Sequence, residues 1–252
     1  KPKRFTNMDG LEWKRTKYSK PIKRFLEFAE WLGAKFGGHL VADSKGIKSY
    51  LKKKYDLNST FIPYGAEAFD NPNEGNLTKY DLTPYSYNML IARLEPENNI
   101  ETILHSVTES RLSKKMIVVG NTTNGFGTQM KEKYESEQIV FTEGIYNTED
   151  LNNLRYFSNL YFHGHTVGGT NPSLLEAMAC KSLIVAHDNP FNKAILEEDG
   201  FYFKSAKDIT EYLRKDIEKR AFQDMVERNY QKIKETYNWP SVIHQYQKLL
   251  TG

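Results

Sequence analysis

Residues 163–180, HGHTVGGTNPSLLEAMAC, lead from an apolar run into a helix through a glycine-rich turn. Asn171 is a preferred N-cap residue, and Pro172 suits the first helical position, where no backbone donor is needed. The first turn therefore presents free N–H groups and the positive end of a helix dipole, and the Gly-Gly pair lets a bulky anion approach. Glu176 follows as a carboxylate acceptor. The segment predicts either a sugar-nucleotide site or an ordinary capped helix.

Strand-like and helix-like segments alternate on both sides of this turn. Several of the strand-like runs are apolar at every position, which is typical of parallel strands buried on both faces. We expect strands at 87–92, 116–119, 139–141, 160–162, 183–186 and 201–203. We expect helices at 99–108, 127–136, 148–157, 172–181, 192–196, 206–213, 218–237 and 240–250. The pattern predicts an α/β fold with a doubly wound parallel sheet.

The first 65 residues have the same character on a smaller scale. We expect helices at 21–37 and 46–55 and strands at 39–42 and 59–63. A stretch rich in Asn, Pro, Gly and acidic residues follows and favours a linker. We therefore divide the chain into an αβ segment, a linker, a sheet domain and a final helical segment, at 1–65, 66–86, 87–237 and 238–252.

Composition narrows the possible classes of protein. Hydrophobic residues make up 39% of the chain, which is enough for a packed core and argues against disorder. The one cysteine, Cys180, excludes an internal disulfide and is either a nucleophile or a small buried side chain. The given sequence contains no run long enough to span a membrane and no signal peptide, so we expect a cytoplasmic protein.

Charge is distributed unevenly along the chain. Residues 1–54 carry 15 Lys and Arg against 5 Asp and Glu, whereas the remainder carries 20 against 27. The basic segment predicts an anionic neighbour, such as a membrane surface or a lipid diphosphate, or else a solvated helix face. Nucleic acid is disfavoured because the sequence has no zinc-finger spacing, recognition-helix signature or aromatic RNA-binding motif.

Four loops follow predicted strands and should meet at one edge of the sheet, where such sheets bind ligands. They contain residues 93–96, 120–121, 144–146 and the segment after His163. Other site types fit less well. The glycines at 120–127 lack the Lys and Ser/Thr of a phosphate loop, no G-x-G-x-x-G opens a helix, and no G-x-S-x-G is present. His163 and His165 have no evident third metal ligand nearby, so no metal is expected.

Three segments together resemble the C-terminal nucleotide-binding domain of glycosyltransferase family 4, the group 1 enzymes with a GT-B fold. These are IARLEPENNIETIL (91–104), IVVGN (117–121) and GGTNPSLLEAMACKSLIVAHD (168–188). Earlier segments are similar to rhamnosyltransferase-type members of bacterial polysaccharide clusters: NMDGLEWKRTKYSKPIKRFLEFAEWL (7–32), VADSKGIKSYLKKKY (41–55) and FIPYGA (61–66). The resemblance implies two Rossmann-like domains, of which residues 1–65 would be the last part of the N-terminal, acceptor-binding one. It implies an N-terminally truncated chain that is inactive by itself, with its final helix packed back on that domain.

The resemblance also assigns donor contacts. Arg93 would bind the donor diphosphate, and Glu176, the second acid of the family's Glu-x7-Glu motif, would hold the ribose. Gly120 would let the donor approach the backbone, and Ile145 or Tyr146 would lie near the base. The remaining donor contacts would come from the turn and the helix that follows it: Gly168, Gly169, Thr170, Asn171 and Leu174.

Two positions depart from the family pattern. The first glutamate of Glu-x7-Glu is Gly168 here, and the lysine five residues after the family's arginine is Asn98. An arginine fork and backbone amides could compensate for the missing cation. A 6-deoxyhexose such as rhamnose, which offers fewer hydroxyls, is compatible with the missing carboxylate.

In addition to Arg93, catalytic groups are expected in the N-terminal segment. Asp9, Glu12 and Arg15 would lie at the cleft, where Asp9 would orient the acceptor hydroxyl and Arg15 would meet an acceptor phosphate; a capped turn with a surface ion pair is the alternative.

The activity implied is transfer of a hexose or 6-deoxyhexose from a nucleoside-diphosphate sugar, with retention and without a metal or other cofactor. The acceptor would be a lipid-diphosphate-linked saccharide at the inner face of the cytoplasmic membrane, reached by peripheral contact through the basic segment. A non-catalytic nucleotide- or sugar-binding module is one alternative, and a sugar-nucleotide epimerase of related fold is another.

Overall fold

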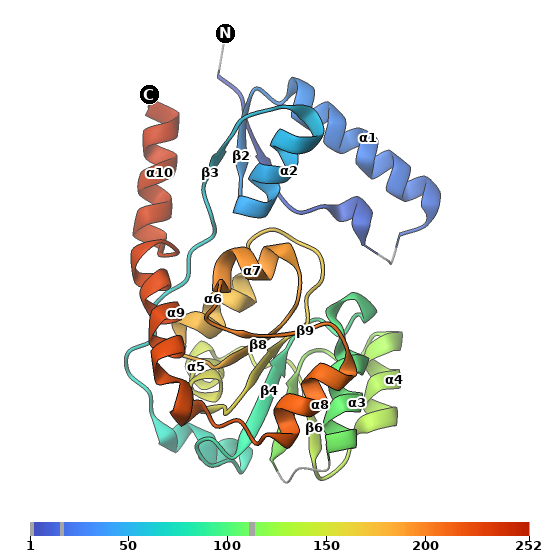
Figure 1. The fold of residues 1–252 in the computed structure, drawn as a ribbon, viewed down its shortest axis with the longest axis vertical. Helices are drawn as coiled ribbons and strands as arrows, with labels where there is room; N and C mark the ends of the chain where they lie inside the picture. The colour runs from blue at the N-terminus through green and yellow to red at the C-terminus, as the bar shows by residue number, and fades with distance from the viewer. Residues whose placement is uncertain (1–2, 16–17, 111–113, 252) are drawn as a thin grey trace.

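The structure, a computed structural model, describes residues 3–15, 18–110 and 114–251, which form two α/β lobes (Figure 1). Lys1 and Gly252, which end the outermost predicted segments, lie outside the described residues. We call the lobe around the three-stranded sheet the small lobe and the lobe around the six-stranded sheet the large lobe.

The large lobe is built on a parallel sheet with the strand order β6-β5-β4-β7-β8-β9. Its strands are β4 (Tyr87–Ile91), β5 (Lys115–Val119), β6 (Ile139–Thr142), β7 (Tyr161–His163), β8 (Ile184–His187) and β9 (Phe201–Phe203). Its helices are α3 (Ile100–Ser110), α4 (Gly125–Tyr134), α5 (Thr148–Phe157), α6 (Pro172–Ala179), α7 (Pro190–Leu196), α8 (Ala206–Arg214) and α9 (Gln223–Glu235). The predicted α/β class and parallel sheet are confirmed.

Both faces of this sheet are buried, because alternate strand residues enter two separate cores. In β4, Met89 packs in one core and Leu90 in the other, and in β5 the same holds for Ile117 and Val118. The first core contains residues of α5, α6 and α9, and the second contains residues of α3, α4 and α8. Burial on both sides explains the uninterrupted apolar runs in the sequence.

The small lobe is a parallel sheet of order β1-β2-β3 with two helices. Its elements are β1 (Phe5–Met8), the 3₁₀ turn η1 (Glu12–Lys14), α1 (Lys20–Phe36), β2 (His39–Ala42), α2 (Lys45–Tyr55) and β3 (Ser59–Phe61). Strand β1 was not predicted, because its four residues FTNM offer only Phe5 and Met8 as apolar positions. The lobes meet where Phe191 of α7 packs on the core that contains Ile47 of α2.

The last helix, α10 (Trp239–Thr251), leaves the large lobe and runs beside the small one (Figure 1). Val242 packs with Val41 of β2 and with Ile62, which follows β3. The chain thus crosses between the lobes twice, and the crossings are joined by a hydrogen bond of 2.7 Å from Ala66 N–H to the Tyr237 carbonyl.

Two segments differ from expectation. The predicted linker contains the 3₁₀ helix η2 (Glu74–Tyr80), and Leu77 is only 1% exposed because it packs in the first core of the large lobe. The predicted helix at 218–237 is divided into η4 (Lys219–Phe222) and α9. Lys219 is buried and its ammonium donates to the Tyr156 carbonyl, which draws η4 against the end of α5.

Helix α1 has an apolar face that no described residue covers. The exposed side chains are Ile22, Phe25, Phe28, Trp31, Leu32 and Phe36. Across the described ranges, no helix combines the length and apolar character that crossing a bilayer requires.

Candidate functional site

The topology of the large lobe marks one position on the sheet edge. If β4 is counted as strand 1, the strand order is 3-2-1-4-5-6, which is the doubly wound order. In such sheets ligands bind at the topological switch point, where the strand order reverses. That point lies between β4 and β7, so the loops that follow these strands should flank a crevice. They contain residues 92–99 and 164–171, which include the glycine-rich turn that opened the sequence analysis.

A cavity of about 500 Å³ lies at this point, between the two lobes. Arg93 and Glu176 both line it, so the two groups expected to hold opposite ends of a donor share one hollow. Predicted site residues make up half of its wall: Asp9, Arg15, Arg93, Gly168, Gly169, Thr170, Asn171 and Glu176. Tyr64, Asn98, His165 and Ser173 also line it and had not been assigned as contacts.

The four loops at the strand ends are tied together by polar contacts. Asn99 Nδ2 donates to the Gly164 carbonyl over 2.7 Å, and Asn124 Nδ2 donates to the Leu94 carbonyl over 3.1 Å. The hydroxyl of Thr122 lies 3.4 Å from a carboxylate oxygen of Glu143, which connects the loops after β5 and β6. These contacts confirm that the four loops converge at one edge of the sheet.

The start of α6 has the predicted cap. The side-chain oxygen of Asn171 accepts from Ser173 N–H over 3.0 Å, and Pro172 occupies the first turn. The positive end of the α6 dipole therefore points toward the cavity that Thr170 and Asn171 line. Gly168 has a φ of +153°, a conformation that side-chain-bearing residues rarely adopt, although an added Cβ would have no neighbour within 4 Å. This backbone explains why the position holds glycine and not an acid.

Arg93 projects from the loop after β4 and is exposed in the cavity. Within the described part of the chain, its guanidinium makes no hydrogen bond or ion pair, so all its donors remain available to a ligand. Asn98, which stands where the family has lysine, is buried and donates through Nδ2 to the Arg93 carbonyl over 2.8 Å. Asn98 thus fixes the backbone that carries Arg93 and supplies no charge.

Arg15 reaches the cavity from the small lobe and joins the two lobes. Its Nη1 donates to Glu97 Oε1 over 2.9 Å, and its Nε donates to Glu12 Oε1 over 2.7 Å. Glu97 belongs to η3 (Pro96–Asn98) of the large lobe. Burial favours loss of the Arg15 proton, but hydrogen bonds to Glu97 and Glu12 outweigh it and raise the pKa of Arg15. Glu12 therefore acts through Arg15 and does not line the cavity.

Glu176 stands between this cavity and a second one of about 300 Å³. The guanidinium of Arg155 donates to a Glu176 oxygen, and Arg155 Nη1 donates to Asn152 Oδ1 over 3.0 Å. The Arg155 side chain is 3% exposed, whereas that of Glu176 is 47% exposed. Arg155 therefore orients the carboxylate while leaving it accessible. The smaller cavity is also lined by Tyr64, Thr148 and Leu151.

His163 and His165 stack with their ring centroids 4.5 Å apart. Burial lowers the pKa of His163 well below its usual value, and burial together with Arg93 and Arg15 lowers that of His165 to about 4. Both rings are therefore neutral near pH 7. Among the described residues, no group of three or more His, Cys, Asp and Glu side chains is placed to hold a metal ion.

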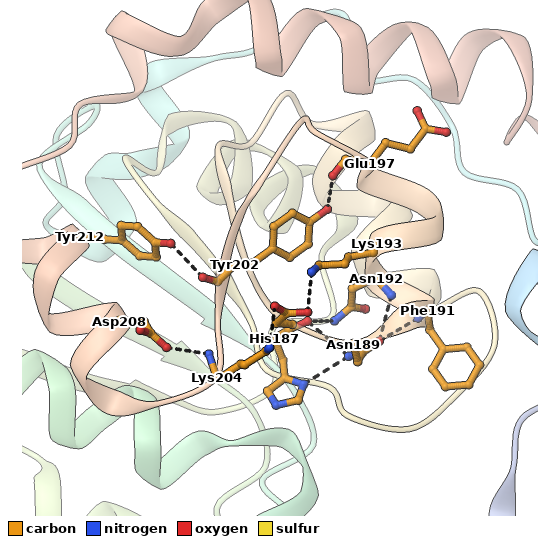
Figure 2. Close-up of polar contacts among 11 residues, drawn as sticks. His187, Asn189, Phe191, Asn192, Lys193, Glu197, Tyr202, Lys204, Asp208 and Tyr212 are labelled. Atoms are coloured by element: carbon orange, nitrogen blue, oxygen red, sulfur yellow. Dashed lines mark hydrogen bonds and ion pairs between the residues drawn. The ribbon is translucent and has the colours of Figure 1, made fainter.

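The loop after β8 fixes the backbone at His165. Asn189 caps α7 by accepting from Phe191 N–H over 2.9 Å, as Figure 2 shows. The Nδ2 groups of Asn189 and Asn192 donate to the His165 carbonyl over 2.9 and 3.3 Å. Asn192 Nδ2 also donates to the His187 carbonyl over 2.9 Å (Figure 2). The segments that follow β7 and β8 are thereby joined at His165, which lines the cavity.

Four predicted donor contacts lie outside both cavity walls. Leu174 is fully buried in the core of the large lobe, so its side chain has no surface to offer a ligand. A Cβ on Gly120 would lie 2.4 Å from the Ala92 carbonyl oxygen, which explains the glycine by close backbone packing. Ile145 is partly buried against the core, and Tyr146 is 92% exposed.

Cys180 ends α6 and is buried. Burial raises the pKa of its thiol to about 12, so the thiol stays protonated near pH 7 and has little nucleophilic character.

Sequence comparisons agree with this geometry. Residues 85–233, more than half of the chain, match the family described as Glycosyl transferases group 1, and residues 1–67 match a domain of unknown function, DUF1972. The chain is 24% identical over 231 residues to the uncharacterized glycosyltransferase MJ1069 of Methanocaldococcus jannaschii, which covers 84% of this chain and 57% of that protein.

Solved structures share the fold. Anabaena Alr3699/HepE in complex with UDP-glucose has a TM-score of 0.76 at 13% identity, covering 98% of this chain and 71% of that one. Sucrose-phosphate synthase from Thermosynechococcus elongatus has a TM-score of 0.75 at 15% identity, covering 97% of this chain and 66% of that one. TarM has a TM-score of 0.73 at 12% identity, covering 99% of this chain and 50% of that one.

These folds confirm the predicted GT-B architecture. The chain spans 57% of the length of the archaeal relative and half of that of TarM. With a family match over more than half of its residues, the chain belongs to the glycosyl transferases group 1 family.

Proposed function

We propose that this chain binds a nucleoside-diphosphate sugar in the cavity between its lobes, as part of a glycosyltransferase. The observation that carries the proposal is that Arg93, Glu176 and the start of α6 line one cavity of about 500 Å³. An available guanidinium, the positive end of a helix dipole and an oriented carboxylate suit a diphosphate and the hydroxyls of a sugar ring. A solved structure of the same fold, that of Alr3699/HepE, is described in complex with UDP-glucose.

The donor would lie along the cavity in a defined direction. Its diphosphate would meet Arg93 and the positive end of the α6 dipole, and its ribose hydroxyls would donate to Glu176. The base would extend past Glu176 into the smaller cavity beside Thr148 and Leu151. This placement is supported by Glu176, which lines both cavities, and by its ion pair with Arg155.

The reaction would be transfer with retention at the anomeric carbon. The C–O bond to the diphosphate breaks, the acceptor oxygen bonds on the same face, and its proton passes to the departing phosphate oxygen. Charge grows on the leaving group, and Arg93 with the α6 dipole would stabilise it without a metal ion. Asp9, which lines the cavity from the small lobe, would orient the acceptor hydroxyl.

The donor sugar is proposed to be a hexose or a 6-deoxyhexose such as rhamnose, in line with a family 4 enzyme of the rhamnosyltransferase type. The family's first glutamate would hold sugar hydroxyls, but position 168 is glycine with a φ of +153°. The cavity walls therefore offer the sugar few carboxylates, which suits a ring with fewer hydroxyls.

The acceptor is proposed to be a lipid-diphosphate-linked saccharide at the inner membrane face. Two features of the small lobe support this. Residues 1–54 are strongly basic, and α1 exposes aromatic side chains such as Phe25 and Phe28 beside Lys23 and Arg24. Helices with an aromatic face and flanking cations bind anionic lipid interfaces.

Calorimetric titration with a panel of nucleoside diphosphates and nucleotide sugars tests the donor site. We expect one base to be preferred, and Arg93→Ala to weaken its binding about tenfold, since a charge-assisted contact to phosphate contributes roughly 1.5–3 kcal/mol. Arg214→Ala, which removes an exposed arginine from α8, is the matched control. A panel without any binder would contradict the proposal, and binding without transfer in the full-length protein would favour a non-catalytic binding module.

A further inference from the structure

Asp43 of the small lobe contacts the glycine-rich turn of the large lobe. It follows the last residue of β2, and its Oδ2 accepts from Thr170 N–H over 3.0 Å. The Thr170 hydroxyl donates back to the Asp43 carbonyl. Both residues are nearly inaccessible, with exposures of 2% for Asp43 and 3% for Thr170. This reciprocal pair joins positions 127 residues apart in the sequence.

The Asp43 carboxyl group lies so close to Gly169 that a side chain at position 169 would collide with it. A Cβ placed on Gly169 would lie 1.9 Å from Asp43 Oδ2 and 2.1 Å from Oδ1. Its three nearest atoms would all belong to that carboxyl group. Unlike Gly168, Gly169 does not have a φ in the range that favours glycine. The Asp43 side chain is therefore the specific reason that position 169 holds glycine.

The surroundings of Asp43 disfavour its ionised form. Its Oδ1 is buried and has no hydrogen-bond partner within the described residues. Burial and the nearby charge of Asp9 raise the pKa of Asp43 to about 7, although the Thr170 N–H opposes the shift. Tyr64 and Tyr246 also face this carboxyl group, and its charge contributes to raising the pKa of each. Asp43 thus accepts from Thr170 at an electrostatic cost to the folded state.

The contact lies beside the proposed diphosphate site. Gly169, Thr170 and Asn171 line the cavity, and Asn171 begins α6. A rotation of this turn would redirect the amides at the start of α6. Because Asp43 holds the turn from the opposite lobe, the orientation of these amides depends on how the two lobes sit together.

We propose that Asp43 is a positioning residue that holds residues 168–171 in the conformation that binds the donor diphosphate, and so couples donor binding to closure of the lobes. This deepens the proposed function and rests on it. Asp43 acts through the backbone of Thr170 and contacts no part of the donor itself. Neither Asp43 nor Thr170 would perform this role if the lobes were apart.

A double-mutant cycle on stability tests the contact without any ligand. Gly169→Ala should lower the Tm by roughly 5 °C or more, because the new methyl group collides with a buried carboxyl group. In an Asp43→Gly background the same change should have a much smaller effect, since the three atoms nearest to the new methyl group are removed. Equal losses in both backgrounds would contradict the coupling of positions 43 and 169.

Donor affinity and hydrogen exchange test the positioning role. Asp43→Ala should weaken binding of the preferred nucleoside diphosphate about tenfold and speed amide exchange in residues 168–171, whereas Asp43→Asn, which can still accept from Thr170, should restore both. Ser44→Ala removes the neighbouring α2 cap at Ile47 N–H and is the control that destabilises the small lobe without touching the turn.

Each outcome has one meaning. Unchanged affinity and unchanged exchange in Asp43→Ala would overturn the positioning role. If the wild-type chain binds no nucleoside diphosphate, the proposed function fails, and exchange at residues 168–171 still decides whether Asp43 holds the turn.

Discussion

Arg15 of the small lobe, which lines the cavity, and Glu97 of the large lobe form an ion pair of 2.9 Å between the lobes. The Glu97 side chain is 4% exposed and that of Arg15 is 18% exposed, so the pair is shielded from solvent on the Glu97 side. An acceptor phosphate that reached Arg15 would have to compete with this carboxylate. The cavity therefore contains one free arginine, Arg93, and one whose charge is already balanced, among the residues described.

Arg15→Ala should lower the free energy of unfolding by about 2 kcal/mol, because it removes the guanidinium that lies 2.9 Å from the buried carboxylate of Glu97. The loss should shrink in the Arg15→Ala/Glu97→Gln double variant, where position 97 no longer carries a charge. Urea unfolding of the four proteins measures the coupling. Lys52→Ala, which breaks the exposed ion pair with Asp56, should leave stability unchanged. If Lys52→Ala and Arg15→Ala lowered stability equally, burial of the Arg15–Glu97 pair would not explain the loss.

Glu176→Gln should discriminate between parts of the donor. The change removes the charge that ribose hydroxyls would bind, so affinity for the preferred nucleoside diphosphate should fall about tenfold. Affinity for pyrophosphate, which has no ribose, should stay the same. Calorimetry with both ligands makes the comparison, and equal losses for the two would mean that Glu176 acts on the diphosphate site or on the fold.

Gly168→Ala should destabilise the protein by about 1–2 kcal/mol through backbone strain alone, because its φ is +153° and no atom lies within 4 Å of the new Cβ. Gly125→Ala is the matched control. Its Cβ would also meet open space, but its backbone lies outside the strained region and begins α4. Denaturant unfolding should show a lower free energy of unfolding only for Gly168→Ala. Equal free energies for the two variants would mean that backbone conformation does not explain why position 168 is glycine and not glutamate.

The prediction of the large lobe from sequence succeeded where the pattern was local. The cap at Asn171 and the carboxylate of Glu176 depend on spacing within one turn and its helix. Leu174 was misassigned for a related reason. Residues two positions apart lie on opposite sides of a helix, so Leu174 faces the sheet when Glu176 faces the cavity. Local spacing suggested the site but did not distinguish the face of α6 that packs on the sheet from the face that lines the cavity.

Asp43 could not be predicted as part of the site from its own neighbourhood. The segment VADS reads as a strand end followed by a cap, and Ser44 does cap α2. The role of Asp43 depends on Thr170, which is 127 residues away and belongs to another lobe. The one local sign is the second glycine of the pair at 168–169, whose purpose becomes visible only when the opposing carboxyl group is placed.

Stability should depend on pH through Asp43, with a definite sign. Its pKa is about 7 in the folded state, against 3.8 for an ordinary aspartate, so the folded protein binds the proton more tightly. The contribution of this group to stability is therefore greatest below pH 4, falls as pH rises toward 7, and is constant above that. The slope is at most about 1.4 kcal/mol per pH unit.

The difference between wild type and Asp43→Asn isolates this contribution. Subtraction is needed because His165, whose pKa is lowered to about 4, adds stability as pH rises through the same range. In urea unfolding, we expect the free energy of unfolding of Asp43→Asn to rise relative to that of the wild type between pH 4 and 7. Parallel profiles for the two proteins would show that Asp43 titrates normally.

The apolar face of α1 should bind anionic vesicles if it meets a membrane. Phe25 and Phe28 are 67% and 54% exposed, and Lys23 and Arg24 lie on the same helix. Phe25→Ser/Phe28→Ser should reduce co-flotation with vesicles rich in acidic phospholipid several-fold, because each aromatic ring contributes apolar area to the bound state. Stability should change little, since both rings are exposed in the free protein.

Salt and a second surface aromatic separate this binding from non-specific adhesion. Tyr146, which is 92% exposed on the large lobe, provides the control Tyr146→Ser, which should float like the wild type. Raising the ionic strength should weaken binding of the wild type, because acidic lipids and the cations of α1 attract each other through a screened interaction. If the double variant floats as well as the wild type, the aromatic face of α1 does not contribute to vesicle binding, and the membrane contact proposed for it is contradicted.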